Sequence, residues 1–309
     1  MIDLTLLGCG GGMPTPDRYL SSLLINYRGR KILIDCGEGT QVSMKMSNSG
    51  FKTIDYICIT HIHGDHIIGL PGLLSTIGNS GRKETLHIIG PEGITEAVNA
   101  FMVIVGQLPY DINIIENPTD PIYVDNNYIN KDIIISTLEV DHSTSCIAYS
   151  FYLKRKAKFD IDKATENEVP KMLWNKLQQN DEITFEDKLY TKDMVMGQDR
   201  KGLKISFVTD TRPNENIEEF IKNSDLFICE GMYGDSEDLK KAIKNKHMIF
   251  KESATLAKNG DVSHLILTHF SPAMKNPSDY KDNATNIFEN TTIGYDRMNI
   301  SLKFKDNND

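Results

Sequence analysis

Three histidines and one aspartate fall within six consecutive positions of this chain, at His61, His63, Asp65 and His66. They follow directly after an apolar, strand-like run at 55–60. Imidazole and carboxylate groups are costly to bury without partners, and four of them together would repel or desolvate one another unless a cation were bound. Such groups suit borderline divalent metals, zinc above all. The segment therefore predicts a metal site, and the alternative interpretation is a polar surface loop.

Further candidate ligands stand where other strand-like runs end. His142, Asp210 and His269 each come just past a run of strand residues, and Glu230 closes another such run. Loops at the ends of strands in layered α/β folds are common places for chemistry. One residue of this kind would mean little, but several that converge with the first loop would form a two-metal site.

The composition is that of an ordinary globular protein of 309 residues, with 39% hydrophobic and 25% charged residues. No apolar run approaches the roughly 20 residues that a membrane span requires. The first residues resemble a strand and lack the features of a signal peptide. The five cysteines are scattered, which predicts reduced thiols. Together these features predict a cytoplasmic protein without a membrane partner.

Short β-rich runs alternate with helical patterns along most of the chain, which predicts a layered α/β architecture. The predicted strands are 3–7, 21–27, 31–35, 55–60, 85–89, 133–140, 145–153, 202–209, 225–230, 262–268 and 299–304. The predicted helices are 40–47, 92–105, 215–223, 236–245, 252–259 and 279–289. Glycine and proline at 10–14 and 69–72 predict loops beside the site.

Residues 154–200 break this rhythm, because they are polar and charged and lie between two strand-like runs. The segment predicts an arm inserted into the fold, and the alternative is an ordinary surface excursion. A net charge of −9 argues against a nucleic-acid partner. From Lys154 to Lys176, however, seven basic residues stand against four acidic ones, a local excess of +3. Local positive charge of this kind permits contact with nucleic acid.

Four motifs together resemble those of a known family. They are the glycine–proline–threonine segment from Gly8 to Ser22, the segment Leu33–Gln41, His247 with Ala254 and Ala257, and His269-Phe270-Ser271. On these motifs and the metal-ligand pattern, the chain resembles the metallo-β-lactamase-fold hydrolases and, among them, the ribonuclease Z family of tRNA 3′-processing endonucleases. The chain departs from the family at Val169-Pro170, where many members have Gly-Pro, and at Pro272-Ala273, where an arginine is common.

The resemblance implies a four-layer αβ/βα metallo-β-lactamase sandwich that forms one domain over 1–309, with a flexible tRNA-binding arm, or exosite, at 154–200. It also implies removal of the 3′ trailer from precursor tRNA, leaving a tRNA 3′-hydroxyl and a 5′-phosphorylated trailer. The enzyme would act as a homodimer, one subunit's arm holding tRNA while the other subunit cuts. The arm residues expected to bind substrate are Lys154, Arg155, Lys156 and Lys158.

The resemblance assigns roles to the site residues as well. Two zinc ions per subunit, or manganese or iron in their place, would hold the hydroxide that attacks the phosphodiester. One ion would take His61, His63 and His142, the second Asp65, His66 and His269, and Asp210 would bridge them. Asp65 would also hold the proton of the nucleophile. His247, oriented by Glu230, would donate a proton to the leaving ribose oxygen.

Other functions fit the same ligand pattern. A general phosphodiesterase or a carboxylic ester or lactone hydrolase on this fold is one alternative, but it would not need the 154–200 insertion with its basic residues. A metal-binding RNA scaffold without catalysis is another, which a missing ligand would favour. The glycine-rich loop lacks the spacing and partner acid of a dinucleotide site, so no nucleotide cofactor is expected.

Overall fold

The computed structural model describes residues 1–125, 129 and 131–305. Two seven-stranded sheets form the main unit, which comprises residues 1–153 and 203–309. The first sheet has the order β16 (Met298–Leu302), β1 (Ile2–Gly8), β2 (Ser22–Tyr27), β3 (Arg30–Ile34), β4 (Ile54–Cys58), β5 (Leu86–Gly90) and β6 (Ile112–Glu116). The second has the order β15 (Thr291–Ile293), β14 (Leu265–Thr268), β13 (Leu226–Glu230), β12 (Arg200–Val208), β9 (Ile147–Arg155), β8 (Ile133–Glu139) and β7 (Ile122–Val124).

Alternating apolar residues give the first sheet two buried faces, because successive side chains of a strand point to opposite sides. On β2, Leu23 and Ile25 join a core shared with the second sheet, whereas Leu24 joins a core formed with helices. On β3, Ile32 and Leu33 divide in the same way. Strands buried on both faces need helices as an outer layer.

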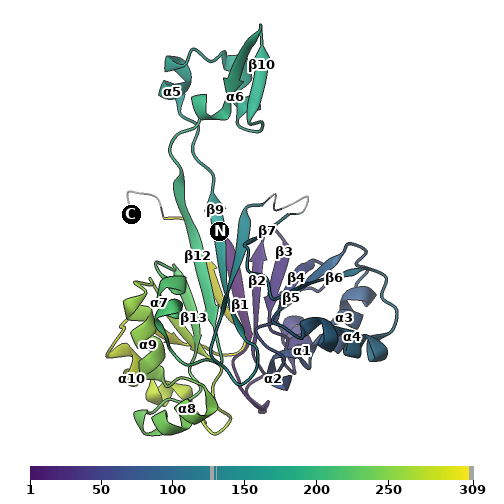
Figure 1. The fold of residues 1–309 in the computed structure, drawn as a ribbon, viewed down its shortest axis with the longest axis vertical. Helices are drawn as coiled ribbons and strands as arrows, with labels where there is room; N and C mark the ends of the chain where they lie inside the picture. Colours follow the sequence, from purple (N-terminus) through teal and green to yellow (C-terminus); the bar gives the residue numbers. More distant parts are fainter. Residues whose placement is uncertain (126–128, 130, 306–309) are drawn as a thin grey trace. The chain divides into compact units, whose positions relative to one another are not determined.

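Helices cover the outer faces of both sheets (Figure 1). The first sheet is covered by α1 (Thr40–Met46), α3 (Leu70–Asn79) and α4 (Ile94–Val105), and the short α2 (Gly64–Ile67) follows β4. Beside the second sheet lie α7 (Glu215–Ile221), α8 (Leu239–Asn245), α9 (Phe250–Asn259) and α10 (Asp282–Thr285). Short 3₁₀ turns lie at Ser236–Asp238 and Pro277–Tyr280. The layered α/β prediction is therefore confirmed.

Residues 154–202 form a second compact unit, which we call the arm. Its elements are α5 (Ile161–Glu166), α6 (Lys171–Leu177), β10 (Glu182–Phe185), β11 (Lys188–Thr191) and a 3₁₀ turn at Lys192–Met194. The larger members of its own small core are Val169, Leu173, Leu177, Tyr190 and Val195. Trp174 closes this core, and its indole N–H donates to the Val169 carbonyl oxygen at 2.9 Å.

The prediction of a loop at 69–72 is wrong, because α3 begins at Leu70. Pro71 occupies the first turn of α3, where a missing backbone N–H costs nothing. Strands β6, β7, β10, β11 and β15 were not predicted; four of these five run for only three or four residues. All five cysteines are buried and unpaired. Among the described residues, no helix is both long enough and apolar enough to cross a membrane.

Candidate metal centre

Loops that follow four strands bring the predicted ligands to one place in the main unit. The side chains that meet there are His61 and His63 after β4, Asp65 and His66 in α2, His142 after β8, Asp210 after β12 and His269 after β14. They fall into overlapping groups of three whose ligand atoms lie within 4.8 Å of one another, and His247 joins one of these groups. Residues far apart in sequence thus converge because the ends of their strands meet.

The two oxygens of Asp210 divide four of the neighbouring histidines into two pairs, and Nδ1 of His247 also lies 3.8 Å from Oδ2. Its Oδ1 lies 3.2 Å from Nε2 of His269 and 3.5 Å from Nε2 of His66. Its Oδ2 lies 3.6 Å from Nε2 of His61 and 3.8 Å from Nε2 of His142. Most of these separations exceed those of good hydrogen bonds, but two ligands of one tetrahedral zinc lie about 3.4 Å apart. The distances therefore fit a carboxylate between two cations.

Three of the imidazole rings keep a buried nitrogen without a hydrogen-bond partner in the described part of the chain. These atoms are Nε2 of His61, His66 and His269. Buried polar atoms in folded proteins nearly always have a hydrogen-bond partner, so three neighbouring nitrogen atoms without one need an explanation. A divalent cation accepts such lone pairs, and the donor set of histidine and aspartate suits one. The residues present thus fit a bound metal.

A buried carboxylate orients two of the rings. Asp35, at the end of β3, accepts a hydrogen bond from Nδ1 of His66 at 2.8 Å and another from the Thr60 backbone N–H at 2.8 Å. The Thr60 hydroxyl contacts Nδ1 of His61 at 3.0 Å. With Nδ1 engaged, each ring presents Nε2 to the centre. Sequence reasoning assigned no role to Asp35, although a carboxylate at a strand end was the available signal.

The glycine-rich loop shapes the centre through its lack of side chains. A Cβ at Gly11 would lie 2.6 Å from Nε2 of His269, so no other residue fits there. The Gly12 backbone N–H donates to Oδ2 of Asp65 at 2.6 Å. Ser21, which the sequence placed only within a strand, lies before β2 and contacts Nδ1 of His269 at 2.7 Å. This loop therefore positions two candidate ligands.

His63 differs from the other rings because it is exposed and turns its Nδ1 inward. This atom lies 3.3 Å from Nε2 of His142. The other nitrogen of His142 lies 3.3 Å from the Lys246 carbonyl oxygen, which orients that ring. Together with His61 these two rings form one of the groups of potential ligands.

Electrostatics favours a neutral His61 and an ionised Asp210, whereas burial would lower the pKa of His66 but Asp210 and Asp35 raise it. Burial lowers the pKa of His61, and the neighbouring His66 adds to this effect. A neutral imidazole offers the lone pair that a metal requires. Burial opposes the ionisation of Asp210, but His269 and His66 hold its pKa well below the ordinary value. Asp210 is thus held as a carboxylate.

Glu230 and His247 form a pair beside these ligands. Glu230 is fully buried at the end of β13, and its Oε2 lies 3.0 Å from Nδ1 of His247. It also accepts hydrogen bonds from the backbone N–H groups of Met248, at 3.1 Å, and Thr211, at 2.7 Å. Burial would lower the pKa of His247, but the Glu230 carboxylate and Asp210 raise it to about 9. His247 is therefore protonated at neutral pH.

A cavity of about 400 Å³ opens over the centre. It is lined by Gly12, His63, Asp65, His142, Ser143, Asp210, Met232, Lys244, Asn245, Lys246 and His247. The cavity thus combines candidate metal ligands, the protonated histidine and two lysines. Such a lining suits an anionic substrate.

The basic residues predicted to bind substrate belong to the arm and not to the centre. Lys154, Lys156 and Lys158 are exposed, and Arg155 is partly buried. At the other end of the arm, the Arg200 guanidinium donates to the Lys156 carbonyl oxygen at 2.9 Å. The hairpin of β10 and β11 is acidic instead, with Asp181, Glu182, Glu186 and Asp187. Positive charge is therefore concentrated where the arm begins and ends in sequence.

Comparison with known proteins places this chain among close relatives. It is 62% identical to the ribonuclease Z of Clostridium beijerinckii over 307 residues, covering 99% of this chain and 100% of that protein. Against the ribonuclease Z of Clostridioides difficile the identity is 60% over 304 residues, covering 98% and 99%. A family model described as Anti-Pycsar protein Apyc1 matches residues 2–196, and this match ends before Asp210 and the later site residues.

Solved structures show the same fold at low identity. The crystal structure of the short form of human tRNase Z aligns with a TM-score of 0.68 at 23% identity, covering 98% of this chain and 100% of that one. The metallo-β-lactamase-fold protein YhfI from Bacillus subtilis aligns with a TM-score of 0.68 at 18% identity, covering 97% and 100%. The prediction of a metallo-β-lactamase fold is confirmed.

Proposed function

This chain belongs to the ribonuclease Z family of hydrolytic endoribonucleases, and we propose that it removes the 3′ trailer from precursor tRNA. The products are a tRNA with a 3′-hydroxyl and a trailer with a 5′-phosphate. Full-length similarity to proteins named ribonuclease Z supports this substrate, as does the fold shared with human tRNase Z. The single observation that carries the chemistry is the position of Asp210 between two pairs of histidines.

We propose two divalent cations per subunit, zinc in the first place and manganese or iron as alternatives. His61, His63 and His142 would hold one, Asp65, His66 and His269 would hold the other, and Asp210 lies between the two groups. Such cations supply Lewis acidity, which lowers the pKa of bound water and offsets charge on the phosphoryl oxygens. All seven ligands are present and converge, which disfavours a scaffold without catalysis.

Two side chains, Asp65 and His247, bind or donate the protons of the reaction in this proposal. Asp65 has one oxygen fixed by the Gly12 N–H, and its carboxylate would hold the proton of the attacking hydroxide by accepting a hydrogen bond from it. His247 is protonated at neutral pH because Glu230 faces it, and it donates a proton to the leaving ribose oxygen. General acid catalysis of this kind contributes about 10²- to 10⁴-fold. Glu230 keeps the donor charged and oriented.

The arm supplies recognition in this proposal. Exposed Lys154, Lys156 and Lys158 contact tRNA phosphates, and Arg155 supports them. The enzyme acts in the cytoplasm as a homodimer in which the arm of one subunit holds the tRNA that the other subunit cleaves. A small-substrate phosphodiesterase or lactonase would have no use for a separate folded unit with exposed basic residues.

The decisive experiment incubates metal-analysed protein with a 3′-extended precursor tRNA and maps both product ends. We expect a 3′-hydroxyl at or next to the discriminator base, and loss of cleavage in Asp65→Ala by on the order of 10²- to 10³-fold or more. Asp111→Ala, which removes an exposed carboxylate distant in sequence from the ligands, is the matched control. Cleavage of simple esters or lactones without cleavage of precursor tRNA would contradict the proposal.

A further inference from the structure

Arg212 lies two residues after Asp210 and reaches the backbone of His247. Its Nη1 donates a hydrogen bond to the His247 carbonyl oxygen. The same guanidinium forms a two-pronged ion pair with Glu252, in which Nη1 lies 3.0 Å from Oε2 and Nη2 contacts Oε1. A planar, forked cation is suited to hold a carbonyl and a carboxylate at once.

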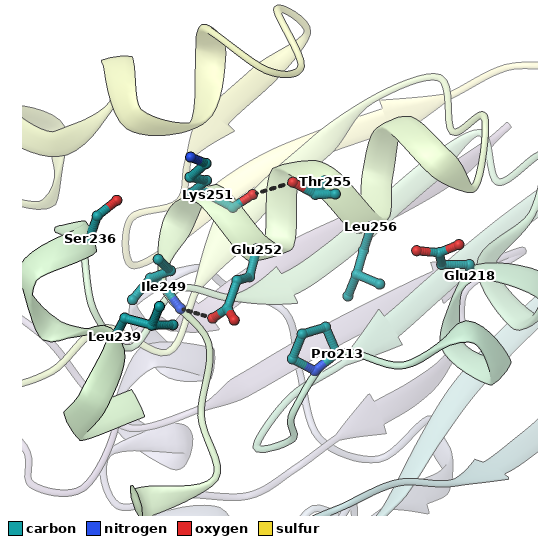
Figure 2. Close-up of a pocket in the computed structure, with 9 residues that line it drawn as sticks. All are labelled: Pro213, Glu218, Ser236, Leu239, Ile249, Lys251, Glu252, Thr255 and Leu256. Carbon is teal, nitrogen blue, oxygen red and sulfur yellow. Dashed lines mark hydrogen bonds between the residues drawn. The ribbon is translucent and has the colours of Figure 1, made fainter. Parts of the chain in front are cut away.

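Glu252 extends this contact to Ile249, the residue just before α9. It is the third residue of α9, and its Oε2 accepts the Ile249 backbone N–H at 3.0 Å (Figure 2). The segment from His247 to Ile249 is thus held at both ends, at the His247 carbonyl by Arg212 and at the Ile249 N–H by Glu252. Glu230 separately holds the ring of His247.

The backbone of Arg212 joins the same segment to the candidate metal ligands. Its N–H donates to the Asp141 carbonyl oxygen at 3.2 Å, next to His142. Lys246 adds a second link, because its Nζ lies 2.7 Å from Oδ1 of Asp141 and 3.0 Å from the His142 carbonyl oxygen. The loops that carry His142, Asp210 and His247 are therefore tied together around Arg212.

The Arg212–Glu252 pair lies at the edge of a cavity. Both side chains are 18% exposed, and Glu252 borders an open cavity of about 330 Å³ (Figure 2). Pro213, Leu239 and Leu256 line other parts of this cavity. The hydrogen bonds of Arg212 and Glu252 converge on the segment that carries His247.

We infer that Arg212 is a positioning residue for His247, an assignment that rests on the proposed general-acid role of that histidine. Without Arg212 the ring keeps its bond to Glu230, but the peptide that carries it loses its anchor to the Asp210 loop. A displacement of about 1 Å at a reacting group costs on the order of 100-fold in rate. Since Arg212 acts through the proton donor, its loss matters most where the leaving group needs a proton.

The test measures single-turnover rates on two substrates, a 3′-extended precursor tRNA and bis(p-nitrophenyl) phosphate, whose phenolate leaves without protonation. In Arg212→Met we expect the ratio of the tRNA rate to the diester rate to fall by about 10- to 100-fold. Arg212→Lys restores part of the ratio, because one ammonium reaches the carbonyl but cannot also fork onto Glu252. The double variant with His247→Ala has the ratio of His247→Ala alone.

Metal content and thermal unfolding, measured on every variant, separate positioning from a structural role. Equal losses on both substrates with reduced metal content, or additive losses in the double variant, would overturn the inference. If His247→Ala lowers the ratio and Arg212→Met does not, the inference fails and the proposed donor stands. If His247→Ala leaves the ratio as in the wild type, both fail. Lys222→Met, which removes an exposed cation paired with Glu219, is the matched control.

Discussion

The main unit and the arm differ in whether they bury charged side chains. The main unit has apolar cores and also buries His66, Asp210 and Glu230 almost fully, with His66 next to Asp210 and Glu230 bonded to the Thr211 backbone N–H. In the arm, whose residues are all described, the buried residues are apolar except for Tyr190 and Gly202. None of the arm's charged side chains is buried. Electrostatic interactions are strong where water is excluded and weak where it is not. We therefore expect the chemistry to lie in the main unit and salt-sensitive recognition to lie in the arm.

Deleting residues 155–198 tests most directly whether recognition and chemistry lie in separate units, and it has the largest expected effect. We expect cleavage of precursor tRNA to fall by on the order of 10²-fold or more, because binding energy remote from the reacting bond is removed. Hydrolysis of bis(p-nitrophenyl) phosphate should change by less than about threefold, because the cores of the main unit contain no arm residue. Rates on both substrates, with thermal unfolding as a control for folding, measure this. Parallel loss of both activities would show that the arm is structural.

Glu230→Gln tests whether the buried charge of Glu230 in the main unit sets the pH dependence of activity. Glu230 raises the pKa of His247 to about 9 against the effect of burial, so removal of its charge lowers that pKa. The protonated donor is then lost at lower pH, and the alkaline limb of the kcat profile for precursor tRNA moves down by about one unit or more. At pH 8.5 a one-unit shift lowers activity about threefold, and a larger shift lowers it further, with a smaller change at pH 6. An unshifted limb would exclude His247 as the titrating acid.

Replacing Lys154, Lys156 and Lys158 together with alanine tests whether the exposed lysines of the arm bind tRNA. At low salt we expect this variant to change activity least of the three. We expect KM for precursor tRNA to rise several-fold, and the slope of log KM against log salt to become shallower by about 1 for each phosphate that the variant no longer binds. The diester rate is the internal reference. Alanine at three exposed lysines of the main unit, Lys83, Lys258 and Lys275, is the charge-matched control. Equal changes in the two triple variants would mean that net charge alone matters.

Local patterns predicted most of the strands and helices of the main unit. The strand predicted at 3–7 is β1, and the helix predicted at 40–47 is α1. The pattern failed where glycine and proline stand inside an element, as at the start of α3. It also failed at β6, whose five residues are half-buried or exposed, so that the apolar signal is weak. Short or partly exposed elements depend on neighbours for their stability, and a local window does not contain those neighbours.

The residue types from His61 to His66 indicated the kind of site, because three imidazoles and one carboxylate within six positions favour a bound cation. The arrangement of the site came from the tertiary structure alone, in which the oxygens of Asp210 lie between two pairs of histidines and Asp35 and Ser21 orient the rings. These contacts join strand ends that are far apart in the chain. Their geometry follows from how two sheets pack and is not encoded in any local pattern.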